Sequence, residues 1–174
     1  MPANTTQIRN AVIEDAPAIA RVHVHSWQKA YAHLFSSKDL EQMSIPEKTK
    51  LWKKSMDQGL LHTLVAESNK QIIGFISVGP ERQTNSSSSN REVWAFYVLP
   101  EHWSTGVGQS LWLEAQKKLI AQGTKNIILW VFINNPRARR FYEAAGFTPE
   151  PNSIQQFELS GVTLEEIRYT HNLG

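Results

Sequence analysis

The chain has 174 residues, of which 41% are hydrophobic and 20% charged, a length and composition typical of one globular domain with a sizeable core. A formal net charge of only +2 argues against nucleic acid as the main partner. The absence of cysteine excludes disulfides, thiolate catalysis and cysteine-based zinc sites. We predict no metal site. No apolar run approaches the length of a membrane span, and the first residues contain no signal-peptide core, so we expect a cytoplasmic protein without a membrane partner.

The chain begins with a predicted strand and an amphipathic helix. Gln7–Ile13 is the strand, Asp15 is placed to cap the helix, and Pro17 is tolerated in its first turn. One face of the helix carries residues at helical spacing, namely Ile19, Val22, His23, Ser26, Trp27, Ala30 and Tyr31. We expect this stripe to pack in the core, with His23 as a hydrogen-bonded and partly buried histidine.

A second helix and a β-hairpin follow. Ser44–Glu47 (SIPE) is a capping box that starts the helix. His62–Glu67 and Gln71–Val78 predict two strands joined by a turn at Asn69-Lys70. The polar, serine-rich stretch 83–91 cannot build a core, so we predict a flexible loop there.

The stretch Arg91–Trp112 is the centre of the chain. An apolar and aromatic strand from Val93 to Leu99 ends at Pro100, and Gly106 and Gly108 precede an amphipathic helix. Backbone N–H groups and a helix N-terminus aimed at one point attract phosphate, and glycines let a ligand approach the backbone. No Lys-Ser/Thr pair follows the glycines and no GxGxxG is present, so neither a Walker A loop nor a dinucleotide fingerprint is predicted.

The remaining chain alternates strands and helices. Asn126–Ile133 is a continuous apolar run, typical of a strand buried on both faces. Pro136 opens a helix that ends at Gly146. Phe147 begins another strand, and Leu164–His171 alternates as the last one.

Two stretches carry a recognisable pattern. The first is the strand end Tyr97–Glu101 (YVLPE), followed by the glycine loop Trp103–Gly108. The second is Asn135–Phe147 (NPRARRFYEAAGF). Both resemble the acetyl-CoA-binding core of the GNAT N-acetyltransferase superfamily. Its members have a Gln/Arg-x-x-Gly-x-Gly/Ala loop, in which Trp103 here takes the place of Gln or Arg, and then Asn-x-x-Ala-x-x-Phe-Tyr-Glu-x-x-Gly-Phe. The two motifs occur in the family's order and at about its spacing.

The element order and this resemblance indicate an α/β (α+β) fold with a GNAT-like mixed, mostly antiparallel central sheet flanked by helices. The resemblance also implies a splayed central strand and a β-bulge. We expect a single domain over residues 7–173, after an N-terminal tail of residues 1–6. A homodimer is common in relatives, and nothing in the sequence requires one.

The resemblance further implies acetyl-CoA as cofactor. Loop backbone groups are expected at the pyrophosphate, and backbone groups of the splayed strand at the pantetheine arm. The predicted cofactor-binding residues are Tyr97, Val98, Leu99, Trp103, Ser104, Thr105, Gly106, Val107, Gly108, Asn135 and Tyr142. Trp27 and Tyr31 are candidates for the wall of the acceptor site, with plain core packing as the alternative.

The activity implied is acetyl transfer to the primary amine of a small molecule or peptide, by direct attack on the thioester. An alkyl ammonium has a pKa of about 10.4 and must lose a proton before it attacks. The Val98 N–H is the expected donor to the thioester carbonyl, Tyr142 the acid for the leaving thiolate, and Glu92 the base or a water-positioning carboxylate. The alternatives are packing beside Phe141 for Tyr142, and an exposed strand end for Glu92. Asn135 can also cap its helix.

Two other function classes stay open at this point. One is a non-catalytic acyl-CoA-binding or sensor module on the same fold. The other is a nucleotide-binding protein that uses Gly106 and Gly108, against which the missing Walker lysine counts. The acceptor amine itself is not identified, because loops that wall a substrate site vary independently of the cofactor core.

Overall fold

The computed structural model describes residues 5–83 and 87–174, so residues 1–4 of the predicted tail and 84–86 of the predicted loop lie outside the described residues. The helices are α1 (Ala16–Ala30), α2 (Ser37–Glu41), α3 (Ile45–Asp57), α4 (Val107–Ala121) and α5 (Pro136–Ala144). The strands are β1 (Gln7–Asn10), β2 (His62–Ser68), β3 (Gln71–Pro80), β4 (Asn90–Val98), β5 (Asn126–Phe132), β6 (Thr148–Pro149), β7 (Gln155–Leu159) and β8 (Val162–Asn172). Short 3₁₀ turns occupy Ile13–Asp15, Pro100–His102 and Pro151–Ser153.

The described strands form one sheet in the order β1-β2-β3-β4-β5-β8-β6, with β7 paired to β8. Their pairings are antiparallel, except that β4 runs parallel to β5. The expected mixed, mostly antiparallel sheet is therefore confirmed. None of the helices in the described residues is both long and apolar enough to cross a membrane.

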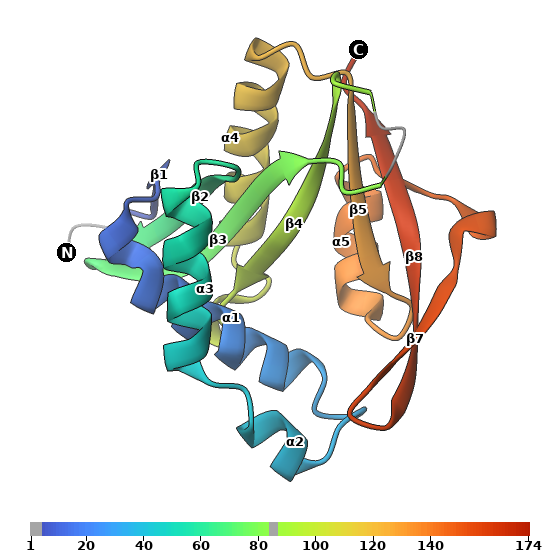
Figure 1. The fold of residues 1–174 in the computed structure, drawn as a ribbon. Helices are drawn as coiled ribbons and strands as arrows, with labels where there is room; N and C mark the ends of the chain where they lie inside the picture. Colours follow the sequence, from blue (N-terminus) through green and yellow to red (C-terminus); the bar gives the residue numbers. More distant parts are fainter. Residues whose placement is uncertain (1–4, 84–86) are drawn as a thin grey trace.

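Helices cover both faces of the sheet (Figure 1). The pair α1 and α3 packs on one face, whereas α4 and α5 lie on the other. Ile19 and Val22 of α1 are fully buried, as is Leu111 of α4, and β3 between them is buried along almost its whole length. Burial of one such aliphatic side chain contributes about 1.5–3 kcal/mol, so these stripes hold the helices on the sheet.

The parallel pair β4 and β5 stays together over only a few residues. Asn90 pairs with Asn126 and Val93 with Leu129, and beyond these pairs the strands diverge (Figure 1). On its other side β4 continues along β3 as far as Val98. The predicted splayed central strand is therefore confirmed, and it leaves a gap in the middle of the sheet.

A β-bulge in β4 accompanies the splay. Ala95 faces Ser77 of β3, whereas Val93 faces the next residue, Val78, so Trp94 is an extra residue on β4. An extra residue bends its strand and increases the local twist. The predicted β-bulge is confirmed, and it lies where β4 begins to leave β5.

Several boundaries differ from those predicted. The Asp15 carboxylate does not cap α1, because it accepts the Val12 N–H and pairs with Arg9 instead. The predicted loop 83–91 is too long, because β4 already begins at Asn90. The prediction lacked α2 and β7, which are five residues each and too short to show a periodicity.

Candidate active site

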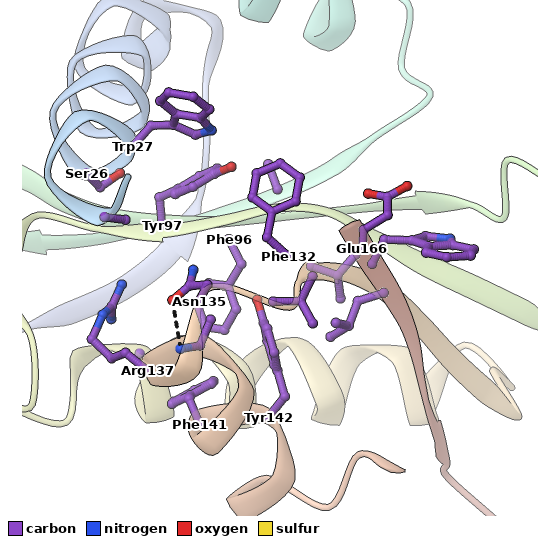
Figure 2. A pocket seen from close by; sticks show the side chains of 18 of the residues that line it. Ser26, Trp27, Phe96, Tyr97, Phe132, Asn135, Arg137, Phe141, Tyr142 and Glu166 are labelled. Carbon is purple, nitrogen blue, oxygen red and sulfur yellow. Dashed lines mark hydrogen bonds between the residues drawn. The ribbon is translucent and has the colours of Figure 1, made fainter. Parts of the chain in front are cut away.

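The gap between β4 and β5 holds a cavity of about 260 Å³, called here the gap cavity. Trp27 of α1 lines it from one side of the sheet, and Tyr142 of α5 lines it from the other (Figure 2). Tyr31, the residue that caps the end of α1, lines it as well. The Tyr97 side chain of β4 and the Phe132 side chain of β5 also line it. Both predicted acceptor-wall residues thus reach the same cavity as the predicted catalytic tyrosine.

A second cavity of about 500 Å³, the loop cavity, lies between α5, α4 and the loop that precedes α4. The two cavities share the lining residues Val98, Gly108, Arg137 and Phe141, which we call the neck. An elongated ligand seated in the loop cavity can therefore reach the gap cavity through the neck.

The glycine loop has the backbone geometry of an anion cradle. Gly106 is the N-cap of α4 with φ +91°, a left-handed conformation that other residues adopt with strain. A Cβ on Gly108 would stand 3.3 Å from the Phe141 ring and narrow the neck. The free N–H groups and positive end of α4 favour a negatively charged ligand at this point, so the loop fits a phosphate group.

The other predicted loop residues divide into two groups. Trp103 and Ser104 line the loop cavity with Gly106 and Gly108. The Thr105 hydroxyl donates to the His102 carbonyl, and the Val107 side chain is buried in the core. Neither of these two residues lines either cavity, so any part they play is through the backbone.

Some backbone N–H and C=O groups at the end of β4 point toward β3, and others point into the gap. The Leu99 N–H donates to the Ile73 carbonyl at 2.8 Å, so the expectation of backbone groups free for the cofactor does not hold for the N–H of Leu99. Polar backbone groups alternate in direction along an antiparallel strand, so those of Tyr97 are also turned toward β3. The backbone groups of Phe96 and Val98 are turned to the gap. Phe96 was not predicted from the sequence.

The Trp103 side chain is hydrogen-bonded to a backbone carbonyl of the neck. Its indole Nε1–H donates to the Val98 carbonyl at 2.7 Å. The Arg137 guanidinium stacks on the same indole, with its carbon 3.6 Å from the ring centroid. A cation over an indole face is a favourable arrangement, so Trp103 ties the loop to both β4 and α5.

Tyr142 extends from α5 toward Phe96 of β4, with 6.3 Å between the ring centroids. Among the described residues its hydroxyl has no hydrogen-bond partner. Burial raises the pKa of Tyr142 above its ordinary value, with a smaller contribution from Tyr31. The phenol is therefore protonated at neutral pH and can donate a proton, but it is not a base.

Asn135 links the start of α5 to α1. Its Oδ1 accepts the Ala138 N–H at 3.2 Å, which confirms the predicted helix cap. Its Nδ2 donates to the Tyr31 hydroxyl at 3.1 Å, and burial raises the pKa of Tyr31 to about 12. The Trp27 ring lies 4.7 Å from the Tyr31 ring. These contacts fix the aromatic wall of the gap cavity.

Glu92 lies inside the protein beside the gap cavity. Its side chain is only 1% exposed, so the alternative of an exposed strand end is wrong. One carboxylate oxygen accepts from Arg82 Nε and Nη2, at 3.0 and 2.6 Å, and the other accepts the Arg82 backbone N–H at 2.9 Å. Arg82 lines the gap cavity and Glu92 does not. A role of Glu92 as base stays a prediction.

Glu166 of β8 is another functional candidate that the sequence did not indicate. It lines the gap cavity and faces Phe132 across the β5–β8 pairing (Figure 2). Burial raises the pKa of Glu166, Arg82 partly offsets this effect, and Glu92 adds to it. The alternating pattern of the last strand gave no sign of this position, because its role depends on the register with β5.

The sequence profile of the acetyltransferase (GNAT) family matches residues 22–147, which is most of the chain. The chain belongs to the GNAT acetyltransferase family. The matched segment runs from α1 to the end of α5, so it includes the splayed strand, the glycine loop and the neck.

Individual GNAT relatives match nearly the whole chain. The uncharacterized N-acetyltransferase YuaI of Bacillus subtilis is 32% identical over 161 residues, which cover 92% of this chain and 89% of the relative. The spermidine N(1)-acetyltransferase of Thermoplasma acidophilum is 27% identical over 157 residues, covering 87% and 93%. The crystal structure of the PaiA N-acetyltransferase of T. acidophilum in complex with coenzyme A superposes with a TM-score of 0.72, at 26% identity, and covers 93% and 98%. This chain is thus placed among the N-acetyltransferases.

Proposed function

We propose that this protein transfers the acetyl group of acetyl-CoA to a primary amine. The observation that carries the proposal is that the loop cavity and the gap cavity meet at the neck. The neck lies beside the part of β4 that no longer pairs with β5. On the loop side, the N-terminus of α4 and the Arg137 guanidinium attract an anionic nucleotide. On the gap side, the aromatic walls and the Glu166 carboxylate suit an amine. The coenzyme A complex of the PaiA enzyme supports the assignment.

Acetyl-CoA, when bound, supplies the acetyl group as a thioester. The residues at its expected place are those of the loop cavity and the neck. The Val98 N–H, turned into the gap, is suited to donate to a carbonyl oxygen on which negative charge develops. The protonated Tyr142 hydroxyl is suited to donate its proton to the leaving thiolate. These two donors come from opposite edges of the gap, β4 and α5.

Removal of the amine proton is the remaining step. Both oxygens of Glu92 are already bonded to Arg82, so we assign Glu92 a water-mediated role rather than direct contact with the amine. An acceptor that enters beside Arg82 could pass its proton through such a water. This part of the proposal rests on the position of Arg82 in the gap cavity.

The acceptor is proposed to be a small amine rather than a peptide. The gap cavity of about 260 Å³ is small, and one relative is a spermidine N(1)-acetyltransferase. The second candidate function is a non-catalytic acyl-CoA sensor, which would bind the cofactor in the same cavities without turnover. The hydroxyl of Tyr142, which has no hydrogen-bond partner in the described part of the chain, favours catalysis.

The test is the release of free CoA thiol from acetyl-CoA with a panel of diamines, monoamines, amino acids and short peptides. We expect turnover with at least one amine. Tyr142→Phe keeps the ring and removes the proton donor, so kcat should fall by roughly 10²–10⁴-fold while CoA still binds. Tyr169→Phe removes the same atom from a hydroxyl outside both cavities and is the matched control. Tight CoA binding without turnover of any amine would favour the sensor instead.

A further inference from the structure

Two sides of the gap cavity carry charges of opposite sign. Arg137 lies at the neck, with its guanidinium over the Trp103 ring. Glu166 lies on the other side of the gap cavity (Figure 2). Their electrostatic neighbours differ: those of Arg137 are Tyr142, Tyr31 and Arg140, and those of Glu166 are Arg82 and Glu92. The positive charge therefore lies where the gap cavity meets the loop cavity, and the negative charge lies on the side proposed for the acceptor.

No described residue forms an ion pair with the Glu166 carboxylate. Arg82 is the cation near it, and Arg82 is already bound to Glu92 through Nε and Nη2. Two carboxylates thus share one guanidinium, which leaves one negative charge in excess. Within the described residues, the Glu166 carboxylate accepts no hydrogen bond. A partly buried carboxylate without a partner is unfavourable, and a cationic ligand would supply that partner.

The walls beside Glu166 also suit a cation. Phe132 stands directly opposite Glu166 in the sheet register, and its ring packs against Tyr31 with 5.0 Å between centroids. Trp27 continues the same wall on α1. Aromatic faces attract ammonium groups and also accept an alkyl chain. An acceptor with an alkyl chain and a positively charged end would match this surface.

The position of Glu166 relative to Tyr142 limits which amine it can bind. Tyr142 reaches the gap from α5, whereas Glu166 lies toward the α1 side with Phe132 (Figure 2). An amine must be neutral when it attacks a thioester, and a carboxylate paired with it favours the charged ammonium. Glu166 is therefore better matched to a second ammonium that does not react.

We propose that the acceptor is an amine carrying a second cationic group, of the short alkane diamine class, and that Glu166 binds this second group. The inference rests on the proposed function and deepens it. It names a specificity-determining residue and predicts that a carboxylate at the same place on the acceptor is rejected.

Three acceptors of equal chain length test the proposal: 1,5-diaminopentane, n-pentylamine and 5-aminopentanoate, which end in an ammonium, a methyl and a carboxylate. The measurement is kcat/KM from thiol release at saturating acetyl-CoA. We expect the diamine to be preferred over both others. Glu166→Gln should lower the ratio of kcat/KM for diamine over monoamine by roughly 10–100-fold, mainly through KM.

Glu165→Gln is the matched control. It removes the same charge from the preceding residue of β8, whose exposed side chain lies on the opposite face and contacts Gln156. The diamine preference should survive in Glu165→Gln. A preference that also survives in Glu166→Gln would overturn the proposal. So would an equal loss with diamine and monoamine, because Glu166 would then act on the reacting amine.

Calorimetric titration of the protein with 1,5-diaminopentane, in the absence of acetyl-CoA, gives a second readout. Wild type should bind the diamine more tightly than Glu166→Gln does. If no amine is turned over and coenzyme A does not bind, the proposed function fails, while this titration still decides the role of Glu166. Equal diamine affinity in the two proteins would count against Glu166 whatever the activity.

Discussion

His23 is a titratable side chain within the packing of α1 against α3. Its Nδ1 accepts a hydrogen bond from Trp52 Nε1 at 3.3 Å, and its ring stacks on Tyr97 with 4.8 Å between centroids. Burial, with a smaller effect of Lys48, lowers the pKa of His23 to about 4. The expectation of a hydrogen-bonded, partly buried histidine is therefore confirmed. Protonation of Nδ1 would break the bond to Trp52.

This pKa predicts a pH-dependent stability. The folded pKa of about 4 lies below the ordinary value of 6.5, so the unfolded chain binds more protons between these two values. The contribution of neutral His23 is complete above about pH 6.5 and is lost as the pH falls toward 4. From pH 7 to pH 5 we expect the free energy of unfolding to drop by about 2 kcal/mol from this group.

Urea unfolding at both pH values measures the effect. His23→Gln should be less stable at pH 7 but should lack this part of the pH slope. His25→Gln, on the exposed face of the same helix, should keep the wild-type slope. Equal slopes in wild type and His23→Gln would contradict the assignment.

At the scale of residues, the two sequence motifs identified those site residues whose positions depend on one helix and its neighbouring loop. Asn135 caps the helix that carries Tyr142, and Gly108 lies in the first turn of another helix, so their spacing in the sequence already places them. Glu166 is different, because it becomes part of the site only through its register with Phe132. Phe96 was missed for a related reason, since the direction of its backbone depends on the pairing of β4 with β3.

At the scale of elements, periodicity predicted the long helices and strands and failed where packing decides. The bulge at Trp94 shifts the alternation of β4 by one residue, so a count along the sequence does not tell which backbone groups face the gap. The family resemblance named Tyr97, Val98 and Leu99 together, whereas in the structure the Leu99 N–H bonds to Ile73. The splay itself followed from the family resemblance and not from composition or periodicity.

The loop between β4 and α4 contains a hydrogen bond that competes with the proposed cofactor contact. Trp103 Nε1 donates to the Val98 carbonyl, which belongs to the backbone turned into the gap. Trp103→Phe keeps an aromatic face for Arg137 and removes the donor. A neutral hydrogen bond contributes about 0.5–1.5 kcal/mol net, so we expect CoA affinity to rise by roughly 2–10-fold. Isothermal titration calorimetry with coenzyme A measures this change.

Trp52→Phe is a suitable control, because it also removes an indole hydrogen bond but lies away from both cavities. Its CoA affinity should equal that of wild type. If Trp103→Phe binds CoA more weakly than wild type, the indole N–H contributes to cofactor binding and does not compete with it. Unchanged affinity would mean that the Val98 carbonyl is not a cofactor contact.

At the scale of the whole molecule, the sheet consists of two parts joined by a short seam. Strands β1 to β4 form one part and β5 to β8 the other, and the β4–β5 pairing extends only from Asn90 to Val93. The two sides of the neck belong to different parts of the sheet. Val98 ends β4 and Gly108 lies in the helix after β4, whereas Arg137 and Phe141 lie in the helix after β5. A ligand in the neck would therefore contact both parts of the sheet.

This arrangement predicts that coenzyme A stabilises the fold as a whole. A ligand present at about 100 times its dissociation constant, and bound only by the folded state, adds roughly 2.7 kcal/mol to the free energy of unfolding. For a chain of this size that corresponds to a rise in Tm of about 5–11 °C. ATP and NAD should give no comparable shift, because no Walker lysine and no GxGxxG are present. Thermal unfolding followed by circular dichroism measures all three ligands under the same conditions.

Gly108→Val separates binding from folding in this experiment. A β-branched side chain at Gly108 would press on Phe141 and narrow the neck, while the N-cap at Gly106 stays unchanged. The variant should unfold cooperatively and show a much smaller Tm shift with coenzyme A than wild type does. A wild-type shift in Gly108→Val would mean that the ligand does not pass through the neck. If saturating coenzyme A leaves the melting curve of wild type unmoved, the cofactor assignment itself is wrong, since ligand binding to the folded state alone must raise Tm.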